Sequence, residues 1–229
     1  MLKKLVLFDI DGTLMDTDGA GNEPFVQALT EVFERSFSAE GYSSSGKTDT
    51  QIALELAEQF GVSREEAMPR LPEVRERYLE KFEPALAAIQ PTVFPGVPEL
   101  VAAVSEHEDC VNGLLTGNFE PAGWMKVGRI GLTDAFEMGS FGDDAPARSD
   151  LPDKAVQNVL DLTGRKFEGK DIVIIGDTPN DVACGRHLNV KSIAVATGNF
   201  GEAELEAAQP DHLFADFADT WRVVEAILA

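Results

Sequence analysis

Two aspartates separated by one residue stand at the end of an apolar run near the N-terminus, in the segment FDIDGTL. In an extended strand Asp9 and Asp11 project from the same side, because Ile10 between them points away. Two carboxylates this close repel each other, which raises the pKa of one of them or attracts a cation. The next residues, Gly12 and Thr13, let the chain turn and place a hydroxyl beside the carboxylates. DG alone is a turn signal, but the full pattern behind an apolar run is far rarer and indicates a functional site.

A second pair of carboxylates follows another apolar run, in the segment IVIIGDTPND. Asp181 comes four residues after Asp177, near the start of a predicted helix, where it would also complement the helix dipole. Mg²⁺ commonly binds one or two protein carboxylates together with water and substrate phosphate. We therefore expect a magnesium site formed by Asp9, Asp177, Asp181 and the backbone carbonyl of Asp11.

A third apolar run ends in a hydroxyl and a glycine, in the segment LLTGN. The hydroxyl of Thr116 and the backbone N–H groups of Gly117 and Asn118 can bind phosphate oxygens. Taken alone this segment is weak evidence, because many strands end in an ordinary turn of threonine and glycine. It gains weight because parallel sheets bind ligands at the carboxyl ends of their strands, where all three segments are expected.

The elements that must position these side chains are short apolar runs, each followed by a polar or glycine-rich turn. Continuous Val, Ile and Leu are typical of strands buried on both faces, as in a parallel sheet. Helical patterns alternate with these runs, and residues 97–104 and 151–164 each place apolar residues on one helix face. This alternation predicts an α/β fold with a doubly wound parallel sheet. The predicted strands are residues 5–12, 111–118, 136–142, 171–177 and 192–198.

Residues 15–93 have a different pattern, with helical periodicity and no good strand. Two capping boxes, which begin at Thr48 and Ser63, mark the starts of helices. We therefore expect a small helical domain of residues 15–93, inserted into an α/β core formed by residues 1–14 and 94–229.

The chain is strongly acidic, since 19 Lys and Arg against 40 Asp and Glu give a formal net charge of −21. Such a surface disfavours nucleic acid and anionic membranes as partners, but it allows a small phosphorylated metabolite at a site neutralised by metal. The apolar runs are too short to span a bilayer, and MLKKLVLFDI lacks the cleavage site of a signal peptide. Cys110 and Cys184 form no CxxC pair, so we expect no disulfide framework and a cytoplasmic location.

FDIDGTL, LLTGN and GDTPND resemble, in order and spacing, the first, second and fourth motifs of the haloacid dehalogenase-like (HAD) hydrolase superfamily. The resemblance covers essentially the whole chain, because the helical insert resembles the C1 cap of that superfamily. It implies a Rossmann-like core, Mg²⁺ as cofactor, and a phosphatase in which Asp9 attacks phosphorus to form an aspartyl-phosphate. Asp11 would protonate the leaving alcohol and then deprotonate the water that hydrolyses the intermediate. The cap would open and close, with hinges near residues 15–20 and 88–95.

The third motif of the superfamily is a lysine or arginine that steadies the phosphoryl group and its nucleophile. Arg148, in ARSDLP, stands where a subset of similar sequences carries RxxLP, and Lys154 in the following helix is the rival. We favour Arg148, because it is nearer to the usual place of this cation. Lys154 is then a solvent-exposed helix residue.

The segment GKTDTQ resembles the GxTD loop of phosphoglycolate phosphatase-like members, where the loop closes over the substrate. By this resemblance Lys47, Thr48 and Asp49 contact the leaving group, although Thr48 is equally explained as a helix N-cap. Phosphoglycolate is accordingly the best single guess for the substrate.

Three other functions are weighed against a phosphatase. A phosphomutase of the β-phosphoglucomutase kind shares the cap and both aspartates of the first motif. A dehalogenase lacks the second of these aspartates, so Asp11 argues against it. A non-catalytic protein that binds a phosphorylated ligand is the least favoured, because every expected catalytic position holds a suitable residue.

Overall fold

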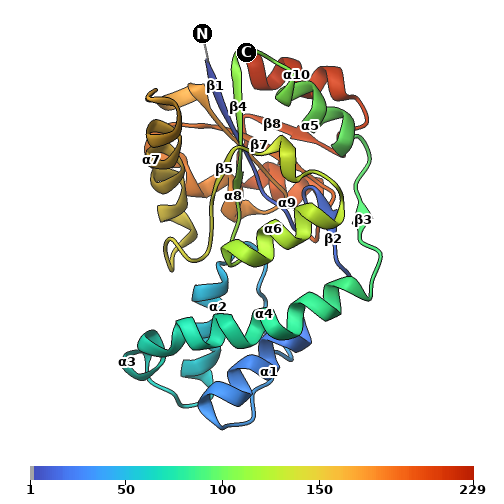
Figure 1. Ribbon diagram of the computed structural model, residues 1–229. Helices are drawn as coiled ribbons and strands as arrows, with labels where there is room; N and C mark the ends of the chain where they lie inside the picture. The colour runs from blue at the N-terminus through green and yellow to red at the C-terminus, as the bar shows by residue number, and fades with distance from the viewer. Residues whose placement is uncertain (1–2) are drawn as a thin grey trace.

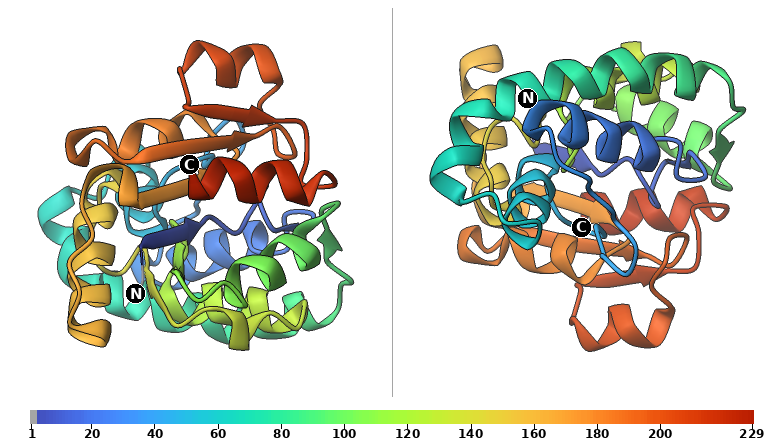
Figure 2. Two further views of the ribbon diagram at one scale, coloured as in Figure 1. Left: turned by 90° about the horizontal axis from the view of Figure 1, so that it is seen from above. Right: turned by 90° about the horizontal axis from the view of Figure 1, so that it is seen from below.

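A six-stranded parallel sheet with helices on both faces forms the larger part of the molecule (Figures 1 and 2). The computed structural model describes residues 3–229, and the order of the strands across the sheet is β5-β4-β1-β6-β7-β8. The predicted α/β fold with a doubly wound sheet is therefore confirmed. The strands are β1 (Lys4–Phe8), β4 (Cys110–Leu115), β5 (Met138–Ser140), β6 (Ile172–Gly176), β7 (Lys191–Val195) and β8 (His212–Phe214).

The order of the strands places a crevice beside β1. The chain proceeds from β1 to β4 and β5 on one side, and then returns to β6, β7 and β8 on the other. In sheets of this kind, ligands bind where the direction of winding reverses, outside the carboxyl ends of the strands. That place lies here between β1 and β6, the two strands that precede the aspartate motifs.

Alternate residues of each strand face opposite layers of helices, which explains the uninterrupted apolar sequences. On β1, Val6 and Phe8 share an apolar cluster with α5 and α10, whereas Leu5 and Leu7 share another with α7. Within residues 3–229, none of the helices combines the length and apolarity needed to cross a bilayer. The helices of this part are α5 (Val97–Ser105), α6 (Glu120–Arg129), α7 (Leu151–Thr163), α8 (Pro179–Cys184), α9 (Glu202–Ala207) and α10 (Thr220–Leu228).

Three short strands lie outside the predicted set. β8 extends the sheet beside β7, and β2 (Met15–Asp16) pairs antiparallel with β3 (Thr92–Val93). Strands of two or three residues are too short to produce a recognisable alternation in the sequence. The β2–β3 pair joins the two segments that connect residues 17–91 to the sheet.

Helices α1 to α4 form a separate group beyond the carboxyl ends of the strands (Figure 1). They have an apolar cluster of their own, which includes Phe25 and Tyr78 and also receives Phe119 from the sheet part. The predicted N-caps are confirmed, because the hydroxyls of Thr48 and Ser63 each accept an N–H of the following helix. The boundaries proposed for the core and cap domains stay a prediction. The helices are α1 (Asn22–Phe33), α2 (Asp49–Gln59), α3 (Arg64–Ala67) and α4 (Leu71–Ala87).

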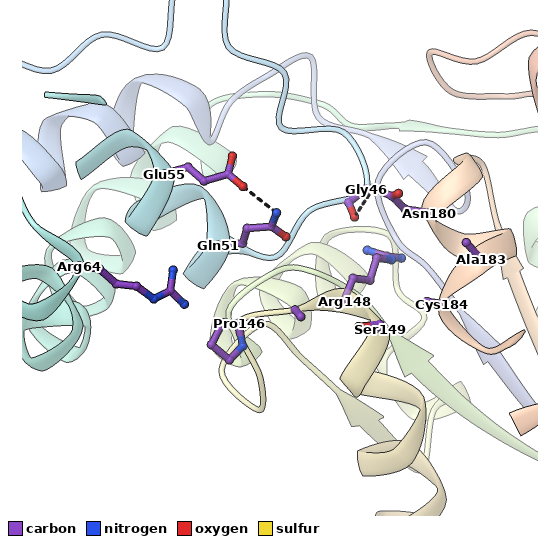
Figure 3. A pocket seen from close by; sticks show the side chains of 11 residues that line it. Gly46, Gln51, Glu55, Arg64, Pro146, Arg148, Ser149, Asn180, Ala183 and Cys184 are labelled. Carbon is purple, nitrogen blue, oxygen red and sulfur yellow. Dashed lines mark hydrogen bonds between the residues drawn. The ribbon is translucent and has the colours of Figure 1, made fainter. Parts of the chain in front are cut away.

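The end of the loop before α2 and the first two residues of that helix, together called the loop of residues 46–50, are hydrogen-bonded to the sheet part. The N–H of Asp49 donates to the carbonyl of Gly117 (2.7 Å), and its carboxylate accepts the N–H of Phe119 (2.7 Å). Figure 3 shows the side chain of Asn180, from α8, donating to the carbonyl of Gly46 (3.0 Å). The loop is therefore held over the ends of the strands. Two hydroxyls add bonds to carbonyl oxygens, Thr48 to Pro146 and Thr50 to Gly142, each 2.6 Å.

Candidate active site

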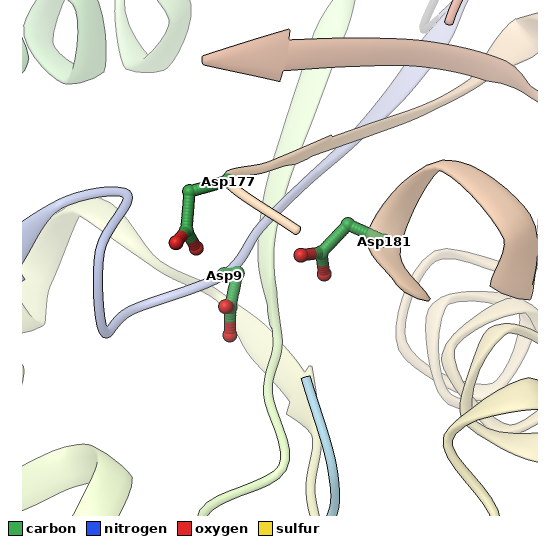
Figure 4. A group of neighbouring side chains, drawn as sticks. All are labelled: Asp9, Asp177 and Asp181. Carbon is green, nitrogen blue, oxygen red and sulfur yellow. The ribbon is translucent and has the colours of Figure 1, made fainter. Parts of the chain in front are cut away.

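Three aspartates converge beyond the carboxyl ends of β1 and β6, as Figure 4 shows. Asp9 follows β1, Asp177 follows β6, and Asp181 comes from the first turn of α8. One oxygen of each carboxylate lies within 4.8 Å of the others, and all three residues are buried. Three of the four carboxylates that the sequence motifs singled out therefore form one buried cluster, whereas the side chain of Asp11 is 44% exposed.

Burial makes negative charge costly in this cluster. Burial raises the pKa of Asp9 to about 6; Arg148 opposes this shift and Asp181 reinforces it. Burial also raises the pKa of Asp177 to about 8, with Asp181 as the next largest cause. A hard divalent cation prefers oxygen ligands and would relieve this repulsion. The donor set therefore fits a cation such as the predicted Mg²⁺.

Glycines allow the backbone to approach the carboxylate of Asp177 closely. Gly12 has a φ of 82°, and a Cβ at this position would lie 2.3 Å from Oδ2 of Asp177. Gly198, in the loop after β7, leaves the same kind of space, since a Cβ there would lie 1.8 Å from the same oxygen. The hydroxyl of Thr13 donates to Oδ1 of Asp177 at 3.3 Å. Gly12 and Thr13 thus shape the surroundings of Asp177, while Gly12 alone of the two lines the cavity described below.

Arg148, and not Lys154, lies in the aspartate cluster. Its side chain is 6% exposed, with Nη2 3.3 Å from Oδ1 of Asp9 and hydrogen-bonded to Asp181. Burial disfavours the charge of Arg148, but the carboxylates of Asp181 and Asp9 raise its pKa overall. Lys154 is exposed on α7. Asp181 also accepts from the N–H and hydroxyl of Thr178, so it anchors Arg148 and α8 in addition to facing the other aspartates.

Asp11 lies beside the segment LLTGN. The amide of Asn118 donates to Oδ2 of Asp11 (2.8 Å) and to the hydroxyl oxygen of Thr116 (2.7 Å). The structure therefore brings the first and second motifs together, as the sequence predicted. Gly117 also lets the loop of residues 46–50 lie close to the sheet part. A Cβ at this position would lie 2.0 Å from the carbonyl oxygen of Lys47 and would block this contact.

Lys126 lies in the site although no sequence motif singled it out. Its Nζ is 2.8 and 2.6 Å from the two carboxylate oxygens of Asp11, and 2.6 Å from Oδ1 of Asn118. Lys126 belongs to α6, where it shares the buried face with Ala122 and Val127. A lysine at an apolar position of an amphipathic helix, directly after LLTGN, is the signal that identifies it.

The three loop residues predicted to contact the leaving group have different surroundings. Lys47 lines the cavity described below, with its Nζ 2.7 Å from Glu55 and 3.2 Å from the hydroxyl of Tyr42. Asp49 lines the same cavity. Thr48 is buried, and its hydroxyl caps α2 and bonds to the sheet part. The N-cap interpretation of Thr48 is therefore the one that its contacts support.

A cavity of about 840 Å³ lies between the sheet and the helical group, and its lining includes Lys126 and Arg148 but not Asp181. The end beside the sheet, here called the inner end, holds Asp9, Asp11 and Asp177, and the side formed by the helical group includes Phe25 and Ile52. One end of the cavity thus suits a phosphoryl group, and the other leaves room for the remainder of a substrate. A smaller cavity of about 450 Å³ lies beyond Arg148 and Gly46, which line both (Figure 3).

The sequence of the chain matches a known family over most of its length. Residues 6–195 match the family described as haloacid dehalogenase-like hydrolase. The chain belongs to the haloacid dehalogenase-like hydrolases. The resemblance inferred from the motifs is thereby confirmed, and the aspartate cluster is the candidate active site of a HAD hydrolase.

Relatives of this HAD hydrolase include curated phosphatases that align along almost the whole chain. A phosphoglycolate phosphatase of Photorhabdus laumondii is 21% identical, covering 94% of this chain and 90% of the relative. An N-acetylmuramic acid 6-phosphate phosphatase of Pseudomonas aeruginosa is 24% identical, covering 86% and 84%. Among solved structures, CbbY of Rhodobacter sphaeroides in complex with phosphate has a TM-score of 0.69 and 19% identity, over 96% of each chain. The curated relatives are named for different esters, so the leaving group is a separate question.

The environment of the Asp49 carboxyl group leads us to predict that the free energy of unfolding of this HAD hydrolase depends on pH. Burial raises the pKa of Asp49 from 3.8 to about 7, although the N–H of Phe119 and the charge of Lys126 oppose the shift. Between these pH values the folded chain binds more protons than the unfolded chain, so the free energy of unfolding falls as the pH rises. Asp49→Asn keeps an oxygen acceptor for Phe119 but does not titrate. Urea unfolding of the metal-free protein from pH 4 to pH 8 should therefore give a flatter curve for the variant.

The control for this experiment is Asp134→Asn, because Asp134 is exposed and its carboxylate is hydrated in both the folded and the unfolded chain. Its unfolding free energy should run parallel to that of the unmodified protein. If the free energy of unfolding of Asp49→Asn also ran parallel to that of the unmodified protein across this pH range, the assignment of a raised pKa to Asp49 would be contradicted.

Proposed function

We propose that this protein is a magnesium-dependent phosphatase that hydrolyses a small phosphate monoester through an aspartyl-phosphate on Asp9. The position of Asp9 carries the proposal, because its buried carboxylate lies at the inner end of the cavity between Asp177 and the guanidinium of Arg148. A carboxylate can approach a phosphate dianion only where cations offset the repulsion. The curated relatives described above are named as phosphatases, which supports the same reaction class.

The two aspartates of the first motif divide the chemistry. A carboxylate oxygen of Asp9 attacks phosphorus, and the bond between phosphorus and the ester oxygen breaks. Asp11 donates a proton to that departing oxygen, which leaves as an alcohol. Asp11 then takes a proton from a water molecule, whose oxygen attacks phosphorus as the bond to Asp9 breaks. The products are the alcohol and inorganic phosphate, and both aspartates regain their starting states.

Cations and backbone donors around Asp9 offset the charge of the phosphoryl group. Arg148 can donate N–H groups to phosphoryl oxygens beside Asp9, and the segment of residues 116–118 offers a hydroxyl and backbone N–H groups at the end of β4. Bound Mg²⁺ would act as a Lewis acid that neutralises charge between the phosphate and Asp9. The residues proposed to hold it are Asp9, Asp177, Asp181 and the backbone carbonyl of Asp11.

Phosphoglycolate is the first substrate to test, and Lys47 is the residue on which this choice depends. Three cations line the cavity within residues 3–229, namely Lys47, Lys126 and Arg148. Lys126 and Arg148 contact the aspartates of the inner end, so Lys47 is the one placed to meet the carboxylate of a glycolate group. Its ion pair with Glu55 is partly exposed, and such pairs contribute little, so a substrate carboxylate can replace Glu55.

Replacing Asp9 tests the covalent mechanism. Asp9→Asn should lower turnover by more than about 10³-fold, because an amide is a poor nucleophile toward phosphorus. The fold should persist, since the change removes one buried carboxylate from a repulsive cluster. Phosphate release in the presence of Mg²⁺ measures the first effect and thermal unfolding measures the second.

The same two assays test the metal. A chelator should abolish phosphate release and added Mg²⁺ should restore it, and Mg²⁺ should raise the Tm of the unmodified protein more than that of Asp9→Asn. Turnover that persists in a chelator, or an active Asp9→Asn variant, would refute this part of the proposal.

A pair of variants decides between the two candidate cations of the third motif. Arg148→Met should lower kcat/KM by at least about 100-fold, because it removes donors that face the phosphoryl group. Lys154→Met should change kcat/KM little, because Lys154 is exposed on α7. Steady-state assays with one substrate measure both. The reverse order of effects would assign the motif to Lys154.

Three esters with the same two-carbon skeleton test the substrate. Phosphoglycolate, 2-hydroxyethyl phosphate and O-phosphoethanolamine end in an anionic, a neutral and a cationic group. The proposed role of Lys47 predicts that phosphoglycolate has the highest kcat/KM, and that Lys47→Met raises KM for this ester alone by roughly tenfold. A preference for the neutral or cationic ester would exclude phosphoglycolate, and isomerisation without phosphate release would indicate a phosphomutase.

A further inference from the structure

Lys126 is a buried lysine whose charged group is directed at Asp11. Its side chain is 7% exposed, whereas the side chain of Asp11 is 44% exposed. The Nζ of Lys126 bonds to both carboxylate oxygens of Asp11, at 2.8 and 2.6 Å. Both oxygens of the Asp11 carboxylate are therefore held by one cation, while the partly exposed side chain lines the cavity.

Asn118 completes the fixation of this carboxylate. Its side-chain N–H₂ donates to Oδ2 of Asp11 at 2.8 Å, and its side-chain oxygen accepts from Nζ of Lys126 at 2.6 Å. The three polar groups form a closed set of hydrogen bonds, each partner touching the other two. A closed set of this kind fixes the direction of a carboxylate more firmly than one contact does.

The surroundings of Lys126 restrict the movement of its ammonium group. Its helix neighbours Ala122 and Val127 are fully buried, and Nζ lies 5.6 Å from the centre of the ring of Phe82, in α4. An ammonium group in such a place requires compensating partners, because burial of an unpaired charge is costly. Asp11 and Asn118 supply them. Lys126 thus lies between the acid/base residue and a helix of the helical group.

We propose that Lys126 is a positioning residue for proton transfer by Asp11. This inference rests on the proposed phosphatase function. Lys126 and Asn118 hold the Asp11 carboxyl group so that it points into the cavity, toward the ester oxygen that departs from phosphorus. In that step the bond between phosphorus and the ester oxygen breaks, a bond between Asp9 and phosphorus forms, and the proton of Asp11 moves to the ester oxygen.

This role predicts a dependence on the leaving group that a purely structural role would not give. A nitrophenolate departs without a proton, whereas an alkoxide requires one. The value of kcat/KM includes only the steps up to release of the alcohol, so it reports the step in which Asp11 donates. A misdirected Asp11 carboxyl should therefore slow cleavage of alkyl esters and spare that of p-nitrophenyl phosphate.

The experiment compares Lys126→Met with the unmodified protein on two esters. For 2-hydroxyethyl phosphate we expect kcat/KM to fall roughly 100-fold, the usual size of a general-acid contribution, and for p-nitrophenyl phosphate less than about threefold. Lys126→Arg keeps the charge and should recover part of the loss. Lys166→Met, at a lysine that is 65% exposed, is the matched control and should behave like the unmodified protein on both esters.

A double variant shows whether Lys126 affects catalysis through Asp11 or independently of Asp11. In the Asp11→Asn background, Lys126→Met should cause no further loss on 2-hydroxyethyl phosphate, because the group that it positions is absent. Equal losses on the two esters, or a further loss in the Asp11→Asn background, would overturn the proposal. If the unmodified protein released no phosphate from phosphoglycolate or from either of these esters, the proposed function itself would fail, which is a different result.

Discussion

Burial of excess negative charge beyond β1 and β6 is the constraint on which the rest of the site depends. Asp9, Asp177 and Asp181 are removed from water together, and the guanidinium of Arg148 is the cation that contacts this group. One positive charge does not balance three carboxylates, and the pKa values of Asp9 and Asp177 are raised, chiefly by burial and in part by repulsion from Asp181. A divalent metal cation would offset this excess negative charge and so favour the approach of a phosphate, which links substrate binding to the electrostatics of the fold.

The parallel sheet holds these carboxylates together. Buried strands β1 and β6 are neighbours in the sheet, so their carboxyl ends hold Asp9 and Asp177 at a fixed separation. Gly12 and Gly198 make room for the carboxylate of Asp177 at this place, because a Cβ at either position would overlap it. The backbone of the two strands and the adjacent glycines thus places the two carboxylates close together.

Much of the fold and part of the site could be predicted from local sequence. Apolar runs that end in polar residues identify buried strands, and parallel strands place their ends together, so the convergence of Asp9, Asp177 and Thr116 followed without a structure. β8 escaped notice because three residues carry no pattern. The position of Arg148 beside Asp9 depends on where α7 begins relative to the sheet, and that is a property of tertiary packing.

Lys126 shows the limit of sequence reasoning most clearly. Helix periodicity places it on the buried face of α6, but the identity of its partner depends on how that helix lies against the loop after β1. The partner is far away in the sequence, and no spacing rule connects the two residues. A side chain that acts through another group, such as Lys126, is therefore identified only when the packing of helices against the sheet is known.

The short ribbon formed by β2 and β3 has a mechanical consequence. The two segments that carry the helical group are hydrogen-bonded to each other through Met15 and Val93, and the N–H of Phe94 donates to the carbonyl of Leu14. Two chain segments that are hydrogen-bonded side by side can bend together, but the hydrogen bonds between them resist twisting and sliding of one segment against the other. We expect this pairing to limit how far the two connecting segments slide past each other during the predicted opening and closing of the helical group.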